Sequence, residues 1–283
     1  MNSLIRRMTR PEVDFAIEQA AKEGWNPGLE DARVFYETDP DGFLIALSDG
    51  RPIGCIAAVS YGNDFAFIGF FIVLEEFRGQ GCGVQLGQTA LARLKKTRTV
   101  GVDGVLAQQK NYEKSGFRFA YSNVRYEYQN AASAPAVQVE AIRPVTGFDF
   151  GRVMAYDRQC FPAERKLFLE KWLCMENAKA CLWEEDAQVK GYGVLRKCKT
   201  GYKIGPLFAD NEVIAQKLFL GLCALAEPAE KVYLDIPEVN LAGIRLAKAL
   251  EMQPIFKTAR MYRGPEPAIQ LQKIFGVTSF ELG

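Results

Sequence analysis

The sequence predicts an α/β (α+β) chain built of two tandem domains. Its 283 residues are about twice the length of a common domain. Short apolar runs with strand character alternate with segments of helical periodicity, which is typical of sheets covered by helices. Landmarks of the first half also recur in the second half at one constant offset.

The recurring landmarks lie 137 residues apart. The pattern Ile5-Arg6-x-x-Thr9-x-x-Glu12 is echoed by Ile142-Arg143-x-x-Thr146-x-x-Asp149, and Gly54 is matched by Gly191. Between the halves, Gln129–Pro135 is small, polar and proline-ended, as linkers are. We therefore expect a duplication, with domains at residues 1–129 and 138–283 and a linker at 130–137; chance agreement of so few positions is the alternative.

Local patterns predict the elements of the first half. Thr9 and Glu12 fit a capping box ahead of residues with helical spacing, and Gly24 fits the end of that helix. The almost unbroken apolar run Phe65–Val73 predicts a central strand buried on both faces. In chain order, we expect strands at Leu4–Met8, Phe43–Leu47, Ile53–Ser60, Phe65–Val73, Val102–Ala107 and Arg118–Tyr128. Helices are expected at Val13–Ala21, at Leu29–Glu37 and from the glycine-rich segment to near Lys95 and Lys96, and a short helical turn at Asn111–Ser115.

Composition narrows the classes of function. With 35 basic and 34 acidic side chains, the net charge of +1 indicates no nucleic-acid partner and no membrane anchor. The absence of histidine excludes Ser-His-Asp and Cys-His nucleophiles and every His-ligated metal. The seven cysteines include no C-x-x-C pair, which predicts reduced thiols, a cytoplasmic location and no metal site. No apolar run reaches the length of about 18 residues that spans a membrane, and no secretory signal pattern opens the chain.

A glycine-rich turn follows the central strand. Glycines at 79, 81 and 83 let the backbone approach a ligand closely and turn its N–H groups inward. The helix behind the turn directs its positive end to the same point, and Arg78 adds a cation at the rim. The spacing differs from a P-loop and from the dinucleotide-binding G-x-G-x-x-G. The turn predicts a pyrophosphate site; a tight strand–helix connection without a ligand is the alternative.

The segment Val73-x-x-x-x-Arg78-Gly79-Gln80-Gly81-Cys82-Gly83 resembles the acetyl-CoA motif of the GNAT N-acetyltransferase superfamily, and the order of elements agrees over residues 3–128. The resemblance implies tandem GNAT-like domains, each with a mixed, mostly antiparallel sheet flanked by helices. It also implies that the strand backbone holds the pantetheine arm and that the turn holds the pyrophosphate of acetyl-CoA. The implied cofactor residues are Phe71, Ile72, Val73, Arg78, Gly79, Gln80, Gly81, Cys82, Gly83, Val84 and Asn111.

A second motif, Tyr112-Glu113-Lys114-Ser115-Gly116-Phe117, resembles the family's Y-E-K-x-G-F signature. By this resemblance Tyr112 is the general acid that protonates the departing thiolate. A phenol with a pKa of about 10 is almost fully protonated at neutral pH and can supply that proton. The alternative is a core tyrosine packed under the next strand.

The general base is missing from its usual place. Many family members carry a glutamate in the strand before the glycine turn, but Phe65–Phe71 contains no carboxylate. Glu75 and Glu76 lie too near the phosphate end. We expect the amine to lose its proton through ordered water or to an acid from another segment.

The acceptor site is expected around the loop between the first two helices. Trp25, Asn26 and Asp31 could hold an amine through cation–π and charge-assisted contacts. A Pro/Gly turn with a core tryptophan is the alternative, and Tyr61 is an equally open case. Asp235 and Glu238 follow an apolar strand of the second half, where they either bind the amine or belong to a solvated turn.

The second half lacks both motifs that carry the chemistry of the first half, the glycine-rich turn and the tyrosine. Its segment Ile204–Glu212 has no R-G-x-G-x-G motif, and Asp210 and Glu212 would repel a phosphate. Ala247 occupies the position of the family's tyrosine. We expect a degenerate domain that shapes the acceptor site.

These observations predict transfer of an acetyl group from acetyl-CoA to a primary amine of a small molecule or peptide, by direct attack in a ternary complex. A non-catalytic acyl-CoA sensor, or transfer of another acyl group, is the alternative. The sequence reveals neither the acceptor nor the oligomeric state.

Overall fold

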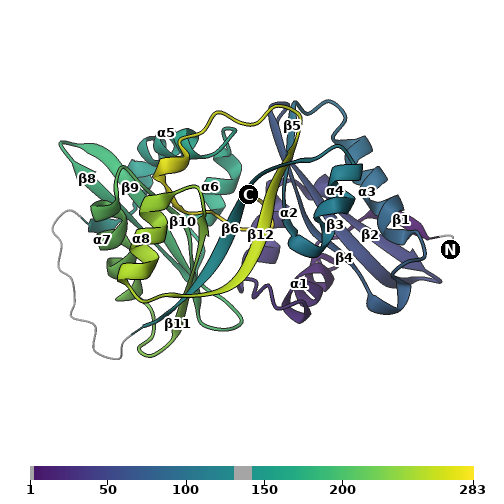
Figure 1. The fold of residues 1–283 in the computed structure, drawn as a ribbon, viewed down its shortest axis with the longest axis horizontal. Helices are drawn as coiled ribbons and strands as arrows, with labels where there is room; N and C mark the ends of the chain where they lie inside the picture. Colours follow the sequence, from purple (N-terminus) through teal and green to yellow (C-terminus); the bar gives the residue numbers. More distant parts are fainter. Residues whose placement is uncertain (1–2, 131–141) are drawn as a thin grey trace.

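The computed structural model describes residues 3–130 and 142–283. The predicted linker, apart from Asn130, lies outside these residues. Within the described ranges, every helix is too short or too polar to cross a membrane. The N-terminus lies at one end of an elongated body, whereas the C-terminus lies near its middle (Figure 1).

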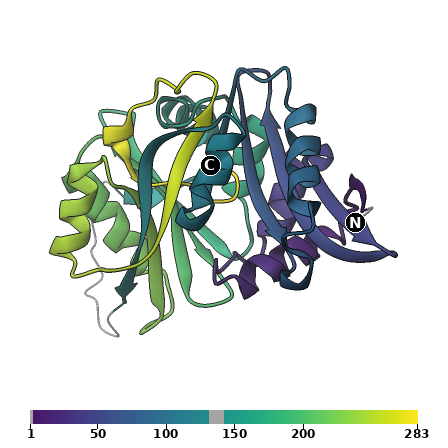
Figure 2. The same cartoon turned by 45° about the vertical axis from the view of Figure 1, so that its right-hand side comes forward.

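One mixed sheet runs through both halves of the molecule (Figures 1 and 2). Its order among the described residues is β1-β2-β3-β4-β5-β12-β6-β11-β10-β9-β8-β7, and β13 pairs with β10. The pairs β4–β5 and β10–β11 are parallel, and the other described pairs are antiparallel, which confirms the expected fold class. The strands are β1 (Leu4–Arg7), β2 (Phe43–Ser48), β3 (Arg51–Tyr61), β4 (Phe65–Val73), β5 (Thr99–Val105), β6 (Arg118–Gln129), β7 (Ile142–Pro144), β8 (Ala178–Glu185), β9 (Gln188–Lys197), β10 (Tyr202–Ala209), β11 (Lys231–Pro237), β12 (Gln253–Arg263) and β13 (Ile274–Gly276).

Helices cover both faces of this sheet. Alternate residues of β3 point to opposite faces: Cys55 and Ala57 join the core that contains α1 and α2, whereas Ile56 and Ala58 join the core under α3. The first of these cores continues into the second half, where Phe35 of α2 stacks on Trp172 of α6 with ring centroids 5.8 Å apart. The helices are α1 (Val13–Lys22), α2 (Asp31–Thr38), α3 (Cys82–Arg93), α4 (Gln109–Lys114), α5 (Phe150–Cys160), α6 (Lys166–Trp172), α7 (Glu212–Cys223) and α8 (Leu241–Ala249).

The two halves repeat one order of elements, β-α-α-β-β-β-α-β-α-β. The paired glycines explain part of the sequence signal. A Cβ atom on Gly54 would lie 3.2 Å from Leu86 of α3, and one on Gly191 would lie 2.9 Å from Leu218 of α7. Each glycine therefore makes room for a leucine of the helix that crosses its strand.

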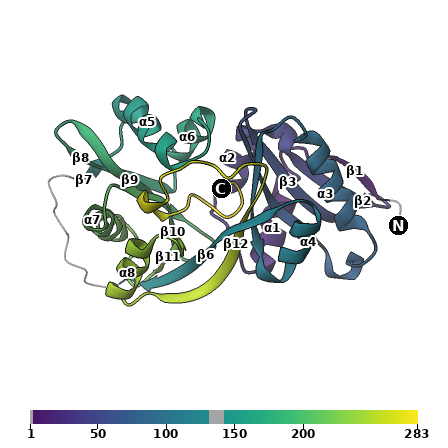
Figure 3. The same cartoon turned by 45° about the horizontal axis from the view of Figure 1, so that its top comes forward.

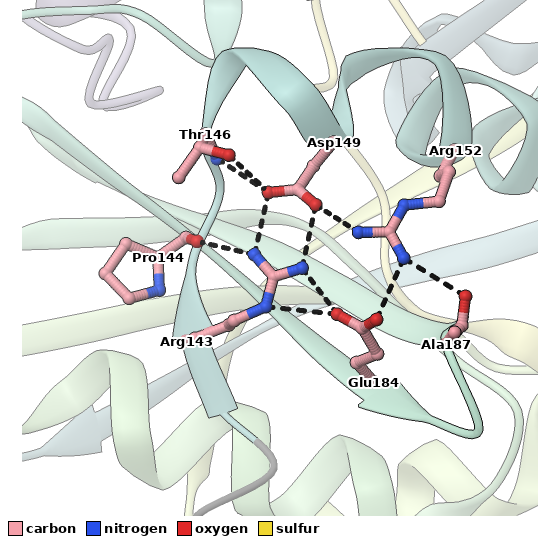
Figure 4. Close-up of polar contacts among 7 residues, drawn as sticks. All are labelled: Arg143, Pro144, Thr146, Asp149, Arg152, Glu184 and Ala187. Atoms are coloured by element: carbon pink, nitrogen blue, oxygen red, sulfur yellow. Dashed lines mark hydrogen bonds and ion pairs between the residues drawn. The ribbon is translucent and has the colours of Figure 1, made fainter.

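The other landmark also folds alike in both halves. Arg143 donates to Asp149 at 2.7 and 2.8 Å, and the Thr146 N–H donates to the same carboxylate at 2.9 Å (Figure 4). In the first half, Arg6 donates to Glu12 at 2.7 and 2.6 Å, and the Thr9 N–H donates to it at 2.8 Å. The capping box is complete at Thr146, whereas α1 begins only after Glu12, whose side chain reaches back to Thr9.

The closing strands of the two halves are exchanged. With domains at 1–129 and 138–283, the strand Arg118–Tyr128 is expected to belong to the sheet of the first half. Instead, β12 of the second half inserts between β5 and β6 of the first, and β6 pairs with β11 of the second. The two strands lie side by side at the centre of the molecule (Figure 1).

Buried ion pairs accompany the exchange on both sides. Arg260 of β12 donates to Asp103 of β5 at 2.7 and 2.6 Å, and Arg125 of β6 donates to Asp235 of β11 at 2.7 Å through two nitrogens. All four side chains are buried. Each closing strand thus carries an arginine whose carboxylate partner belongs to the other half, so both buried ion pairs join the two halves.

Candidate active site

The centre of the site is a gap in the first half of the sheet. β4 and β5 pair from Phe65↔Thr99 only to Ile68↔Val102. Beyond that point β4 bulges against β3 at Phe70, which has the positive φ of 47° that is rare outside glycine. The strands part here, so the edge of β4 that faces β5 has no strand partner beyond Ile68.

A cleft with about 50 Å³ of space for water lies at this gap and is lined from both faces of the sheet. Phe71 and Tyr112 line it on the α3 and α4 face, whereas Trp25, Phe256 and Phe280 belong to the core of the opposite face. Two reactants that enter from opposite faces would therefore meet inside the sheet. The cleft is lined by Trp25, Ile68, Gly69, Phe70, Phe71, Val102, Asp103, Val105, Gln108, Tyr112, Phe256, Thr258 and Phe280.

The glycine turn lies between β4 and α3. Gly79 and Gly81 adopt φ angles of +74° and +89°, and α3 begins at Cys82. Within the described residues, we find no hydrogen-bond acceptor for the amide N–H groups from Gly79 to Val84. These donors, together with the positive end of a 12-residue helix, can hold a phosphate group.

Arg78 holds the turn in place. Its Nε donates to the Val73 carbonyl at 2.8 Å, and its Nη2 pairs with Glu23 at the end of α1 at 2.7 Å. The side chain of Val84 is exposed, whereas that of Cys82 is buried under α3.

Tyr112 projects from α4 onto the cleft. Its ring lies against Gly104, where a Cβ atom would meet the ring at 2.9 Å or closer, and packs edge-on to Phe71 with centroids 6.4 Å apart. Burial raises the pKa of Tyr112 to about 12. Asn111 is exposed on the same helix and donates to Gln108 at 2.7 Å.

The predicted acceptor loop joins the two halves. The Trp25 carbonyl accepts from Arg125 at 2.8 Å and from Lys203 at 2.9 Å. Asn26 exchanges two hydrogen bonds with the Thr200 backbone, at 2.8 and 3.0 Å. Asp31 is fully buried and accepts from Arg196 at 3.1 Å. Trp25 lines the cleft, while Asn26 and Asp31 hold its loop against the second half.

The other predicted acceptor residues lie in three places. The Tyr61 hydroxyl is buried and donates to the Leu282 carbonyl at 3.1 Å. Asp235 accepts hydrogen bonds from Arg125. Glu238 is exposed and forms an ion pair with Lys257 at 2.6 Å. None of the three lines the cleft within the described residues.

Several cleft residues had no motif in the sequence. Phe256 and Thr258 reach the site because β12 crosses into the first half, and Phe280 because the chain end returns to it, whereas Asp103 comes from β5 of the first half. Burial raises the pKa of Asp103 above its ordinary value, although Arg260 and Asn123 oppose this by donating to the carboxylate. Among these residues, only Asp103 gave a sequence signal for the site, because it is a carboxylate near the start of the expected strand Val102–Ala107.

Comparison with known proteins agrees with this geometry. The model of the Acetyltransferase (GNAT) family matches residues 11–117, and that of the Acetyltransferase (GNAT) domain matches residues 153–276. Holothin acyltransferase of Pseudoalteromonas sp. (strain SANK 73390) is 31% identical over 268 residues, which cover 94% of this chain and 90% of that protein. The chain belongs to the GNAT superfamily.

Solved structures share the tandem fold. A Pyrococcus horikoshii structure described as an acetyltransferase superposes with a TM-score of 0.84 at 24% identity, covering 99% of this chain and 96% of that one. A tandem GNAT protein from the clavulanic acid biosynthesis pathway has a TM-score of 0.64 at 15% identity, covering 94% and 100%. The protein is thus a GNAT acyltransferase with a second, C-terminal GNAT-like domain.

In the second GNAT-like domain the corresponding gap is filled. β10 and β11 pair in parallel only from Tyr202 to Ile204, and β13 pairs with β10 further along, at Leu207 and Phe208. Asn211 caps α7 through the Ile214 N–H at 3.0 Å, and Ala247 is buried in α8. In this domain the chain itself therefore occupies the gap beside β10.

Proposed function

We propose that this acyltransferase moves an acetyl group from acetyl-CoA to a primary amine by direct attack in a ternary complex. The observation that carries the proposal is the cleft through the sheet, with unpaired backbone donors on one side and an aromatic chamber on the other. The relatives support an acyltransferase, and we infer the acetyl donor and the amine acceptor from the site.

In the proposed reaction the N–H groups from Gly79 to Val84 hold the diphosphate, and the open edge of β4 at Phe71, Ile72 and Val73 holds the pantetheine arm. An unpaired N–H on that edge stabilises the developing oxyanion. Tyr112, protonated because its pKa is about 12, gives its proton to the departing thiolate.

A small molecule is the acceptor that the site favours. The acceptor side is closed by the loop of Trp25, by β12 and by the chain end at Phe280. The name of the relative holothin acyltransferase also supports a small acceptor. We further propose a cytoplasmic location, because all seven cysteines are free thiols.

Calorimetry with acetyl-CoA, followed by intact-mass detection of products from a panel of amines, tests the proposal. We expect donor binding and mass gains of one acetyl group. Binding without thiol release above the hydrolysis background would identify an acyl-CoA sensor instead. Faster turnover of butyryl-CoA or hexanoyl-CoA would identify a longer acyl donor, and absence of donor binding would overturn the proposal.

A further inference from the structure

The chain end after β13 is built into the acceptor side of the cleft. Residues 276–283 are buried, and the C-terminus lies between the two halves in all views (Figures 1, 2 and 3). A Cβ atom on Gly69 would overlap the backbone of Glu281, so the chain end lies directly on the bend of β4. Phe280 and Gly69 both line the cleft, so Glu281 lies next to this wall, although its own side chain is not among the described residues that line the cleft.

Glu281 carries a buried carboxylate without a partner. Its exposed fraction is 1%, and neither Oε1 nor Oε2 has a hydrogen-bond partner within the described residues. Burying a carboxylate without hydrogen bonds is costly, and buried charges in proteins are normally paired. A carboxylate that is buried at this cost is better explained by a role toward a bound ligand than by a contribution to folding.

Buried cations surround the Glu281 carboxylate, but none of them forms an ion pair with it within the described residues. Arg125 pairs with Asp235, and Lys203 donates to the Trp25 carbonyl, whereas Arg196 pairs with Asp31 through Nε and leaves its Nη2 without a partner in the described residues. Burial lowers the pKa of Lys203, and the Glu281 charge opposes this, although no ion pair within 4.0 Å joins Glu281 to any of the three cations in the described residues. Arg125 also lies over the Phe280 ring, 4.9 Å from its centroid, so the residue before Glu281 contacts the side chain that holds the acceptor loop.

We propose that Glu281 is the general base for the acceptor amine, and that the acceptor carries this amine on a flat aromatic body. The aromatic body follows from the walls, Trp25, Phe256 and Phe280. This inference rests on the proposed function, and it supplies the carboxylate that β4 lacks from a segment about 210 residues further along the chain.

Glu281 and Tyr112 together account for the protons that the reaction moves. The amine nitrogen bonds to the thioester carbon, the C–S bond breaks, and one N–H proton passes to Glu281 directly or through one water. Tyr112 gives its proton to the thiolate. Glu281 and Tyr112 then return to their starting states by exchange with solvent, so that the net reaction is amine plus thioester to amide plus thiol.

Glu281→Gln tests the inference in the full chain, with aniline and benzylamine as probes and glucosamine as a polar comparison. We expect kcat/KM for the aromatic amines to fall about 100-fold, while the Kd for acetyl-CoA changes less than about twofold. Glu266→Gln is the matched control, because Glu266 is exposed in the same C-terminal segment and has no polar partner in the described residues.

The thermal stability of the protein can be measured without an acceptor and gives a second test. Since Glu281 accepts no hydrogen bond in the described residues, Glu281→Gln, which keeps the size and polarity of the side chain, should leave the Tm of the ligand-free protein within about 2–4 °C of the wild type. A Tm that falls by several degrees would show a structural role and overturn the inference, as would Glu281→Gln with turnover within threefold of the wild type. Failure of the proposed function would look different, because the wild type itself would then bind no acetyl-CoA.

Discussion

Tyr112 shows how one side chain acquires its role from its contacts. The ring is held between Gly104, Phe71 and Phe117, and the last of these packs edge-on at 5.9 Å. The same packing raises the pKa of the phenol to about 12, so that it remains a proton donor throughout the physiological range.

Tyr112→Phe should lower kcat by about 10²-fold or more while donor binding stays within about twofold, because the ring packing survives and only the proton is lost. The wild-type contribution requires the protonated phenol. It is therefore complete well below pH 12 and is lost only as the pH rises through about 12. Stopped-flow or steady-state thiol release from pH 6 to 10 checks this; an alkaline loss of kcat in that range that vanishes in Tyr112→Phe would contradict it.

At the scale of elements, the bend of β4 and the chain end form one unit. The bulge at Phe70 turns β4 away from β5, and Gly69, without a side chain, lets the chain end pack onto the bend. The hydrogen bond from Tyr61 to the Leu282 carbonyl secures the same contact from β3. The cleft wall thus depends on a glycine that the helix and strand patterns alone leave unexplained.

Gly69→Ala should lower the free energy of unfolding by about 1–3 kcal/mol or more, because the new methyl group overlaps the backbone of Glu281. Activity should fall further than stability explains, since the chain end must shift. Gly151→Ala in α5 is the control: its Cβ meets no atom within 4 Å, and it should be neutral or stabilise by about 0.5–1 kcal/mol. Urea unfolding measures both, and equal stability of the two variants would refute the contact.

For the whole molecule, the exchanged strands make the halves interdependent. β12 completes the first half and β6 joins the second, and a single aromatic core links α2 to α6. Neither half keeps its own sheet order without the other, so we expect one cooperative unfolding transition.

The Arg260–Asp103 pair tests this interdependence. Arg260→Leu leaves a buried carboxylate without its main partner and should cost about 3–5 kcal/mol, whereas the double variant Arg260→Leu with Asp103→Leu should recover much of that loss. Chemical denaturation of the single and double variants, analysed as a double-mutant cycle, gives the coupling. Additive losses, or separate transitions of the two halves, would contradict a shared structural role.

Much of the site was predictable from local sequence. The strand Phe65–Val73 has the predicted bounds, and the glycine turn, α3 and the helix with Tyr112 follow it in the predicted order. These features depend on short-range rules: glycine permits positive φ, apolar runs form strands, and helix ends leave N–H groups free. The position of Glu281 had no such local signal.

The sequence by itself determined the duplication, the elements of each half and the donor-side motif, because each is encoded within a few residues or by repetition of a pattern. Only the tertiary structure decided which half receives β6 and β12, what fills the gap in the second domain, and which side chains form the acceptor wall. Those outcomes depend on pairings between residues more than 100 positions apart, such as Arg125 with Asp235 and Gly69 with Glu281, and no local pattern records them.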